Sequence, residues 1–233
     1  MTYANLIITI DGPAGAGKGT IAKLLAEHYG LKYLDTGTIY RGVGLQLLLS
    51  GKNPDNPLDA LDVAKNFAFD FKQTPSGDYH AFVGGEDVEN RLRTADVGQA
   101  ASKVAAYGDV RQVLLDFQKQ FVATHSPKGV VLDGRDTGTV IAPEATAKFF
   151  LDASPEVRAQ RRVDADYAIN GVKPDYKDML AQIIERDARD RSRTDAPLKP
   201  ADDALVIDTS DKPIDEVFAM ARAFTEKAIA QLA

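Results

Sequence analysis

Residues 6–20 constrain the fold of this 233-residue chain more than any other segment. The run LIITI at 6–10 is short, apolar and β-branched, which predicts a buried strand, and a glycine-rich stretch follows it. From Lys18 to Tyr29 apolar residues recur at helical spacing, and Gly30 is a typical helix stop. A strand that enters a helix through a glycine-rich turn is typical of an α/β protein with a parallel sheet.

The turn itself has the pattern G-x-x-x-x-G-K. It consists of Gly12, Pro13, Ala14, Gly15, Ala16, Gly17, Lys18, Gly19 and Thr20. Such a turn points backbone N–H groups inward and adds the positive end of a helix dipole, so it predicts a cradle for the phosphates of ATP, with Lys18 reaching the β- and γ-phosphates. Gly19 stands where many such loops have Ser or Thr, and the hydroxyl comes one residue later, at Thr20. The plain alternative is a glycine-rich turn with a chance lysine.

The rest of the chain continues the alternation of strands and helices. Further buried strands are expected at 31–34, 129–133, 147–151 and 204–208. Helices are expected at 38–50, 58–67, 95–107, 109–125, after Ser154 and at 177–193. Residues 67–91 differ, because their period-two pattern and PSGD and GG turns predict a small antiparallel meander. The predicted fold class is α/β, a five-stranded parallel P-loop core with a small antiparallel insertion.

Composition excludes several classes of protein. The net charge of -6 argues against a nucleic-acid binder, which needs a positive field. The chain has no cysteine and its three histidines stand apart, so no protein-held metal site is expected. No apolar run approaches the roughly 18 residues of a membrane span and no signal peptide is recognisable, so no membrane partner and a cytoplasmic location are expected.

Arginines are concentrated late in the chain, with seven of thirteen between Arg158 and Arg193. An acidic protein that gathers guanidinium groups in one segment is suited to a small anionic ligand there. Arg158, Arg161 and Arg162 follow the N-cap Ser154 at i, i+3 and i+4, so they share a helix face that can neutralise phosphate charge. Surface decoration is the alternative.

The helix expected at 177–193 carries a stripe that changes from apolar to charged. Its members are Met179, Ile183, Arg186, Asp190 and Arg193. This change indicates a helix that leaves the core and enters a cleft. The alternative is a solvated helix, and the pairs Glu185/Arg189 and Asp187/Arg191 explain its other faces.

Charged residues also follow two of the predicted strands. Asp35, Thr36 and Arg41 come after 31–34, and Asp133, Arg135 and Asp136 come after 129–133. The carboxyl ends of parallel strands are where ligands bind in such sheets, so both groups are candidates for a ligand site. A solvated loop, or a solvated helix residue for Arg41, is the other interpretation.

Seven segments in order carry a resemblance to a known family. They are ITIDGPAGAGKGT, LDTGTIYR, QAASKVAA, LDGRDTGTVIAP, FFLDAS, ERDARDRSR and APL. Over nearly its whole length the chain resembles the bacterial-type cytidylate kinases. The resemblance implies phosphoryl transfer from ATP to CMP and dCMP by a monomer, with Mg2+ held through ATP phosphates and water. The alternative is a kinase for another nucleoside monophosphate or a small metabolite; a GTP switch is disfavoured because no N/T-K-x-D motif is present.

The same resemblance implies roles for individual residues. Lys18 and the lid arginines Arg158, Arg161 and Arg162 are expected to act on the transferring phosphoryl group. The residues expected at CMP are Arg41 and Arg135 at its phosphate, Ser102, Arg186 and Asp190 at its sugar, and Thr36, Arg111, Asp136 and Arg193 at its base. Asp133 is expected to order the water shell of Mg2+.

The expected domain organisation follows from these segments. Residues 1–36, 95–153 and 194–233 are assigned to the P-loop core. Residues 37–94 are assigned to a monophosphate-binding region with the β insertion at 67–91. A helical lid at 154–176 is followed by the helix 177–193, which lines the cleft.

Overall fold

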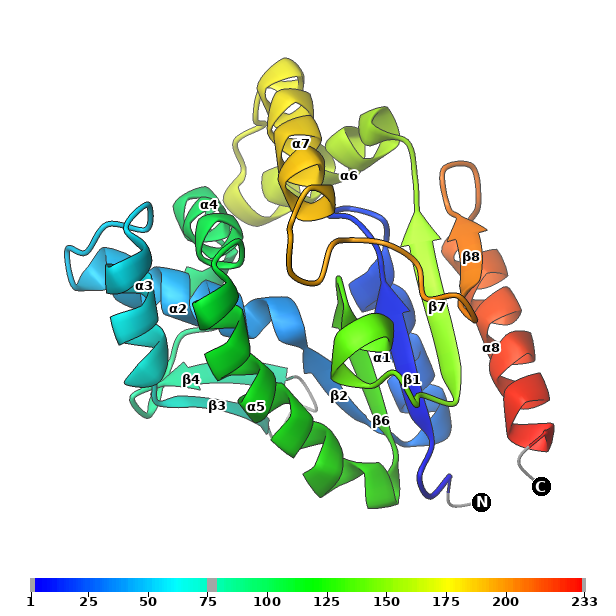
Figure 1. The fold of residues 1–233 in the computed structure, drawn as a ribbon. Coiled ribbons are helices and arrows are strands. Elements are labelled where there is room, and N and C mark those ends of the chain that lie inside the picture. Colours follow the sequence, from blue (N-terminus) through cyan, green and yellow to red (C-terminus); the bar gives the residue numbers. More distant parts are fainter. Residues whose placement is uncertain (1–2, 75–78, 232–233) are drawn as a thin grey trace. The chain divides into compact units, whose positions relative to one another are not determined.

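The computed structural model describes residues 3–74 and 79–231 (Figure 1). The chain forms two compact units. The first comprises Met1–Tyr33 and His125–Ala233, and the second comprises Leu34–Thr124. The first unit holds the glycine-rich loop, and the second holds the antiparallel insertion.

A five-stranded sheet has the strand order β2-β6-β1-β7-β8. Its strands are β1 (Ile7–Asp11), β2 (Lys32–Asp35), β6 (Val130–Gly134), β7 (Ala147–Asp152) and β8 (Leu205–Asp208). Strand β1 pairs in parallel with β6 and β7, and β7 pairs in parallel with β8. The predicted α/β class with a five-stranded parallel sheet is confirmed, and the register brings Asp11 opposite Gly134 at the carboxyl ends of their strands.

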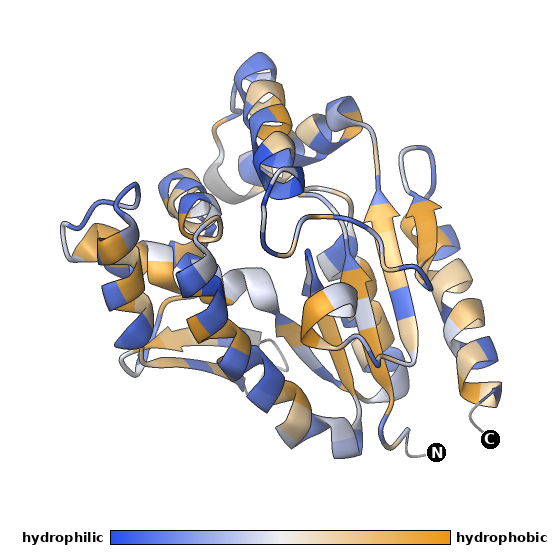
Figure 2. Ribbon diagram, in the orientation of Figure 1, coloured by the Kyte–Doolittle hydropathy of each residue, from blue (hydrophilic) through white to orange (hydrophobic). Residues whose placement is uncertain are grey.

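The central strands are buried because elements pack on them. Ile8, Ile10, Leu132 and Leu151 are fully buried, and Figure 2 shows the strands as the most hydrophobic part of this unit. Helix α1 (Lys18–Tyr29) packs against α8 (Ile214–Ala230), a helix that the sequence analysis did not name. A short π-helix, η3 (Thr137–Ile141), packs against β1 and β6, and a 3-10 turn, η2 (Ser126–Lys128), precedes β6.

Two helices that pack on each other complete the first unit. Helix α6 (Pro155–Asn170) begins at the N-cap Ser154, whose hydroxyl accepts from the Val157 N–H at 3.3 Å. Helix α7 (Tyr176–Arg191) begins at the N-cap Asp175. The two pack through a small apolar cluster that comprises Ala159, Val163, Met179 and Ile183. Helix α7 ends at Arg191, two residues before the predicted end at 193, so Arg193 lies beyond the helix.

The second unit contains most of the remaining helices and a separate sheet. Its helices are α2 (Thr36–Leu49), α3 (Pro57–Lys65), η1 (Arg91–Arg93), α4 (Ala95–Val104) and α5 (Gly108–His125). Strands β3 (Phe69–Gln73), β4 (Tyr79–Val83) and β5 (Glu86–Asp87) form an antiparallel sheet in that order. The predicted meander at 67–91 is confirmed, except that its turn at 75–78 lies outside the described residues.

Residues 95–124 group differently from the expected domain division. They were expected in the P-loop core, whereas the structure includes them in the unit Leu34–Thr124. The reason is that α4 packs on α2 and η1, and so joins them through apolar contacts such as those of Val97 with Leu45 and Leu92. Within 3–74 and 79–231, no helix has the length and apolar character needed to cross a membrane.

Candidate active site

The loop Gly12–Thr20 connects β1 to α1, as predicted. Gly12 has φ +145°, and a Cβ there would lie 1.9 Å from the Leu151 carbonyl oxygen, so only glycine fits this turn. Gly17 caps α1 in the left-handed region. The loop thus leads directly into the α1 N-terminus, which is the placement that the motif requires for phosphate binding, and phosphate binding itself stays a prediction.

Lys18 lies in this turn with its side chain buried. Its Nζ donates to the Pro13 carbonyl at 2.9 Å and lies 3.9 Å from an Asp133 carboxylate oxygen. Asp133, at the carboxyl end of β6, also faces Gly19, where a Cβ would lie 3.2 Å from Asp133 Oδ2. A Cβ at this position would require Asp133 Oδ2 to shift by a few tenths of an ångström, and glycine leaves this carboxylate oxygen beside the loop. Thr20 is exposed.

Asp11 fixes the turn that follows β6. Its carboxylate accepts three hydrogen bonds of 2.8 Å, from the Thr137 N–H, the Thr137 hydroxyl and the Gly138 N–H. Burial raises the pKa of Asp11 to about 6, and the Asp136 carboxylate adds to the rise, while the three donors oppose it. The Asp136 carbonyl accepts from the Val140 N–H at 2.8 Å, so Asp136 is held at the start of η3.

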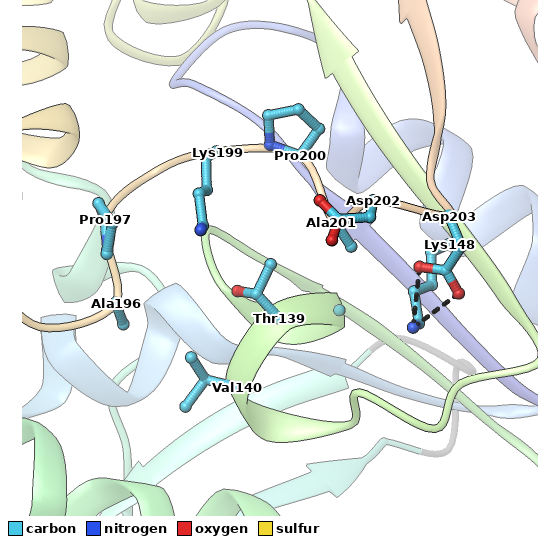
Figure 3. Close-up of a pocket in the computed structure, with 11 residues that line it drawn as sticks. Thr139, Val140, Lys148, Ala196, Pro197, Lys199, Pro200, Ala201, Asp202 and Asp203 are labelled. Carbon is cyan, nitrogen blue, oxygen red and sulfur yellow. Dashed lines mark hydrogen bonds and ion pairs between the residues drawn. The ribbon is translucent and has the colours of Figure 1, made fainter.

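A pocket of about 440 Å3 borders the same turn (Figure 3). It lies between η3 and the segment 196–203, and the Lys148 ammonium in it is paired with Asp203 at 2.9 Å. Lys199 points toward Thr139 in Figure 3. The described residues that line this pocket include none of the predicted site residues.

Asp190 gathers three of the predicted arginines around one buried carboxylate. Arg135 Nε lies 3.2 Å from Asp190 Oδ2, Arg186 Nε lies 3.9 Å from the same oxygen, and Arg193 contacts the other oxygen. Burial raises the pKa of Asp190, but the Arg135, Arg193 and Arg186 guanidinium groups outweigh burial and hold this pKa below its ordinary value. Asp190 therefore holds three guanidinium groups close together, and guanidinium groups are the side chains best suited to bind an anion.

The lid arginines do not converge on one point. Arg158 is buried and pairs with Asp187 through both terminal nitrogens, at 3.1 and 2.5 Å. Arg161 binds Thr209, and Arg162 lies 3.6 Å from Asp166. The structure therefore directs the three guanidinium groups to separate partners.

The ion pairs expected on the outer faces of α7 form only in part. Glu185 pairs with Arg189, as predicted. The expected pair Asp187/Arg191 was wrong, because Asp187 binds Arg158 and Arg191 lies 3.4 Å from Asp152.

The other predicted site residues lie in the second unit, on or against α2. Thr36 begins α2, and Asp35 caps it by accepting from the Gly37 N–H at 2.9 Å. Arg41 Nη1 donates to the Leu92 carbonyl at 2.7 Å. Arg111, from α5, donates to the Ala105 carbonyl at 3.3 Å and lies 5.7 Å from the centre of the Tyr40 ring, while Ser102 is buried on α4.

Sequence reasoning missed three residues that organise the first unit. They are Asp11, Asp187 and Thr209. Asp11 carried one usable signal, because a carboxylate that directly follows a buried apolar run needs donors from elsewhere in the fold. Asp187 binds Arg158, and Thr209 donates to the Ala16 carbonyl. Both partners are distant in the sequence, so local residue spacing does not reveal these contacts.

Comparison with known proteins identifies the family to which the chain belongs. A family model described as cytidylate kinase matches residues 8–226, which is most of the chain. The chain belongs to the cytidylate kinase family. The resemblance drawn from the seven motifs is thereby confirmed, and with it the kinase class.

Relatives within the family match nearly end to end. A cytidylate kinase from Mannheimia succiniciproducens is 43% identical over 225 residues, covering 97% of this chain and 98% of that protein. One from Xanthobacter autotrophicus is 48% identical over 221 residues, covering 95% and 97%. An uncharacterized protein of known structure from Eubacterium ventriosum has a TM-score of 0.51 at 16% identity, covering 95% of this chain and 98% of its own, and shares the fold.

Proposed function

We propose that this member of the cytidylate kinase family transfers the γ-phosphoryl group of ATP to CMP, and also to dCMP, giving ADP and the diphosphate. The observation that carries the proposal is the presence, in one unit, of two separate groups of residues whose chemistry suits anionic groups. One is the glycine-rich loop at Gly12–Thr20, and the other is the arginine cluster around Asp190. A phosphotransferase needs such a pair, one site for the donor phosphates and one for the acceptor.

The mechanism relies on positioning and charge neutralisation. The inward N–H groups of the loop hold the β- and γ-phosphates, and Lys18 exchanges the Pro13 carbonyl for phosphate oxygens. No covalent intermediate on the enzyme is required, because the acceptor's phosphate oxygen attacks the γ-phosphorus directly. Arg162, whose side chain is 36% exposed, is the lid arginine best able to reach the transferring group.

The acceptor residues follow the family resemblance. Arg41 and Arg135 bind the phosphate of CMP, and Ser102, Arg186 and Asp190 bind its sugar. The base is contacted by Thr36, Arg111, Asp136 and Arg193. The buried carboxylate of Asp190 holds Arg135 and Arg193 in fixed orientations. Guanidinium groups with fixed orientations form directional hydrogen bonds to a phosphate or to a planar base, whereas mobile surface arginines provide only a general positive charge.

The residues beside the loop fit Mg2+ held mainly by ATP and water. Among residues 3–74 and 79–231 no group of three or more carboxylate, histidine or cysteine side chains forms a metal cage. Asp133 offers one carboxylate near Lys18 and Gly19, which matches the preference of Mg2+ for one or two carboxylates together with phosphates and waters. When bound, Mg2+ neutralises charge on the β- and γ-phosphates.

A coupled assay tests the proposal directly. ADP formation from ATP is followed with CMP, dCMP, UMP, AMP and GMP as separate acceptors. We expect CMP and dCMP to give the highest kcat/KM and ATP alone to give little ADP. A preference for another monophosphate, or ADP formation that needs no acceptor, would refute the assignment. The monomeric state and the cytoplasmic location stay predictions.

A further inference from the structure

The carbonyl groups of the glycine-rich loop are tied down from outside the loop. A turn that points its N–H groups at a phosphate directs its carbonyl oxygens away, where they need donors. The Ala14 carbonyl accepts from Arg158 Nη1 at 3.1 Å, and the Ala16 carbonyl accepts from the Thr209 hydroxyl at 3.1 Å. Elements far along the sequence therefore hold the back of the loop.

All three guanidinium nitrogens of Arg158 form hydrogen bonds within the protein. Its Nε donates to the Ala153 carbonyl at 2.8 Å, and both terminal nitrogens bind the Asp187 carboxylate. Its relative exposure is 1%, so its charge is neutralised and removed from solvent. A guanidinium in this arrangement would have to break a buried ion pair before it reached a transferring phosphoryl group.

The first turn of α6 also contacts the loop directly. Gly15 has φ +81°, and a Cβ there would lie 3.0 Å from Arg158 Cβ and 3.1 Å from the Arg158 carbonyl oxygen. Arg161 supports the second tie, because it donates to the Thr209 hydroxyl at 3.0 Å. The first turns of α6 and the loop thus form one packed assembly, and the position of the loop depends on the position of Arg158.

We propose that Arg158 and Asp187 are positioning residues for phosphoryl transfer. Arg158 holds the Ala14 carbonyl, Asp187 holds Arg158, and together they keep the loop N–H groups directed at the phosphates of ATP. The inference rests on the ATP-dependent function proposed above. It differs from a direct role of Arg158 on the phosphoryl group, because it makes Asp187, which carries a negative charge, as important for ATP binding as Arg158.

Substitutions at both positions separate the two roles. Arg158→Ala, Asp187→Ala, the double variant and the matched control Glu185→Ala are compared with wild type. Glu185 lies on the same helix as Asp187, and its pair with Arg189 is exposed. The measurements are the Kd of a non-hydrolysable ATP analogue, KM for ATP and for CMP, kcat, and Tm to confirm folding.

We expect each single alanine variant to bind the analogue about tenfold more weakly, the loss of roughly one charge-assisted hydrogen bond. The double variant should bind the analogue no more weakly than the weaker single variant, because both substitutions remove the support that Arg158 gives to the Ala14 carbonyl. Glu185→Ala should stay within about twofold of wild type, as exposed pairs contribute little. An Asp187→Ala variant with wild-type ATP affinity and turnover, beside an Arg158→Ala variant that loses turnover, would overturn the proposal.

Conservative variants decide the matter if the alanine variants fail to fold. Arg158→Lys keeps the charge but lacks the planar fork that reaches Ala14 and Asp187 together, so it should still weaken analogue binding. Asp187→Asn keeps one acceptor oxygen and should give a smaller loss. Wild-type affinity in Arg158→Lys would contradict the proposal. A chain that shows these losses in ATP binding yet phosphorylates none of the monophosphates would support the loop assignment and refute the proposed acceptor.

Discussion

Asp11→Asn tests whether one buried carboxylate at the end of β1 sets the geometry of the turn that carries Asp136. The Asp11 carboxylate accepts from the Thr137 N–H, the Thr137 hydroxyl and the Gly138 N–H, each at 2.8 Å. Asparagine has the same size, and its single oxygen can keep the two Thr137 bonds. Its amide nitrogen then faces the Gly138 N–H, so one buried donor loses its acceptor.

This substitution has two opposing effects on the free energy of unfolding. An unsatisfied buried donor costs about 1–3 kcal/mol. Removing the ionised carboxylate gains free energy, because the rise in the pKa of Asp11 from 3.8 to about 6 means that burying the charge costs about 3 kcal/mol at pH 7, at 1.36 kcal/mol per pKa unit. Stability at pH 7 should therefore change little, while the turn that carries Asp136 is loosened and kcat/KM for CMP falls.

The pH dependence gives the sign of the effect. A carboxyl group whose pKa is raised in the folded state destabilises the fold progressively as pH rises from about 4 to about 6. Free energies of unfolding, measured by urea titration at pH 4 and pH 7 for both proteins, should shift by about 2 kcal/mol in favour of the asparagine variant at the higher pH, because the unfolded-state carboxyl is already partly ionised at pH 4. A shift of the opposite sign would show that the three hydrogen bonds outweigh burial and would refute the reasoning.

The remaining predictions concern three site residues. Lys18→Met should keep the Tm within a few degrees yet nearly abolish turnover, because Lys18 supplies charge to the phosphates; near-normal turnover would refute the loop assignment. Asp190→Asn should reduce the free energy of unfolding by about 3 kcal/mol at pH 7, and the difference should shrink as pH falls through the lowered pKa of Asp190. Asp136→Asn should lower kcat/KM for CMP and narrow the CMP/UMP ratio, since uracil presents an oxygen where cytosine has an amino group and the unpaired carboxylate costs about 1–3 kcal/mol; an unchanged ratio with both rates high would show that Asp136 does not contact the base.

Local patterns were sufficient to predict most of the strands and helices of this fold, although α8 was not among them. The apolar runs identified the five parallel strands, and the period-two segment at 67–91 identified the small antiparallel sheet. Residues 137–141 gave no such signal, because η3 depends on Asp11, which is 126 residues away from Thr137 in the sequence. Such an element follows from tertiary hydrogen bonds and not from its own periodicity.

In the candidate site, sequence spacing predicted which side chains lie on one helix face but not which ion pairs they form. Helical spacing correctly placed Arg186 and Asp190 on one face of α7, and that face becomes buried where it meets Arg135. The same spacing suggested that Arg158, Arg161 and Arg162 act together, and the structure directs each to a different partner. Spacing along one helix shows which side chains are neighbours, but the charges that neutralise them come from other elements.

Charge balance separates the arginines that hold the structure from those available to a substrate. Arg158 and Asp187 are a one-to-one buried pair, so their charges cancel and their contacts serve the loop. Asp190 is shared by Arg135, Arg186 and Arg193, so three positive groups face one carboxylate. Because Arg135 and Arg186 also keep part of their side chains exposed, at 18% and 28%, this cluster, and not the buried Arg158 pair, is the one we expect to contact a nucleotide phosphate.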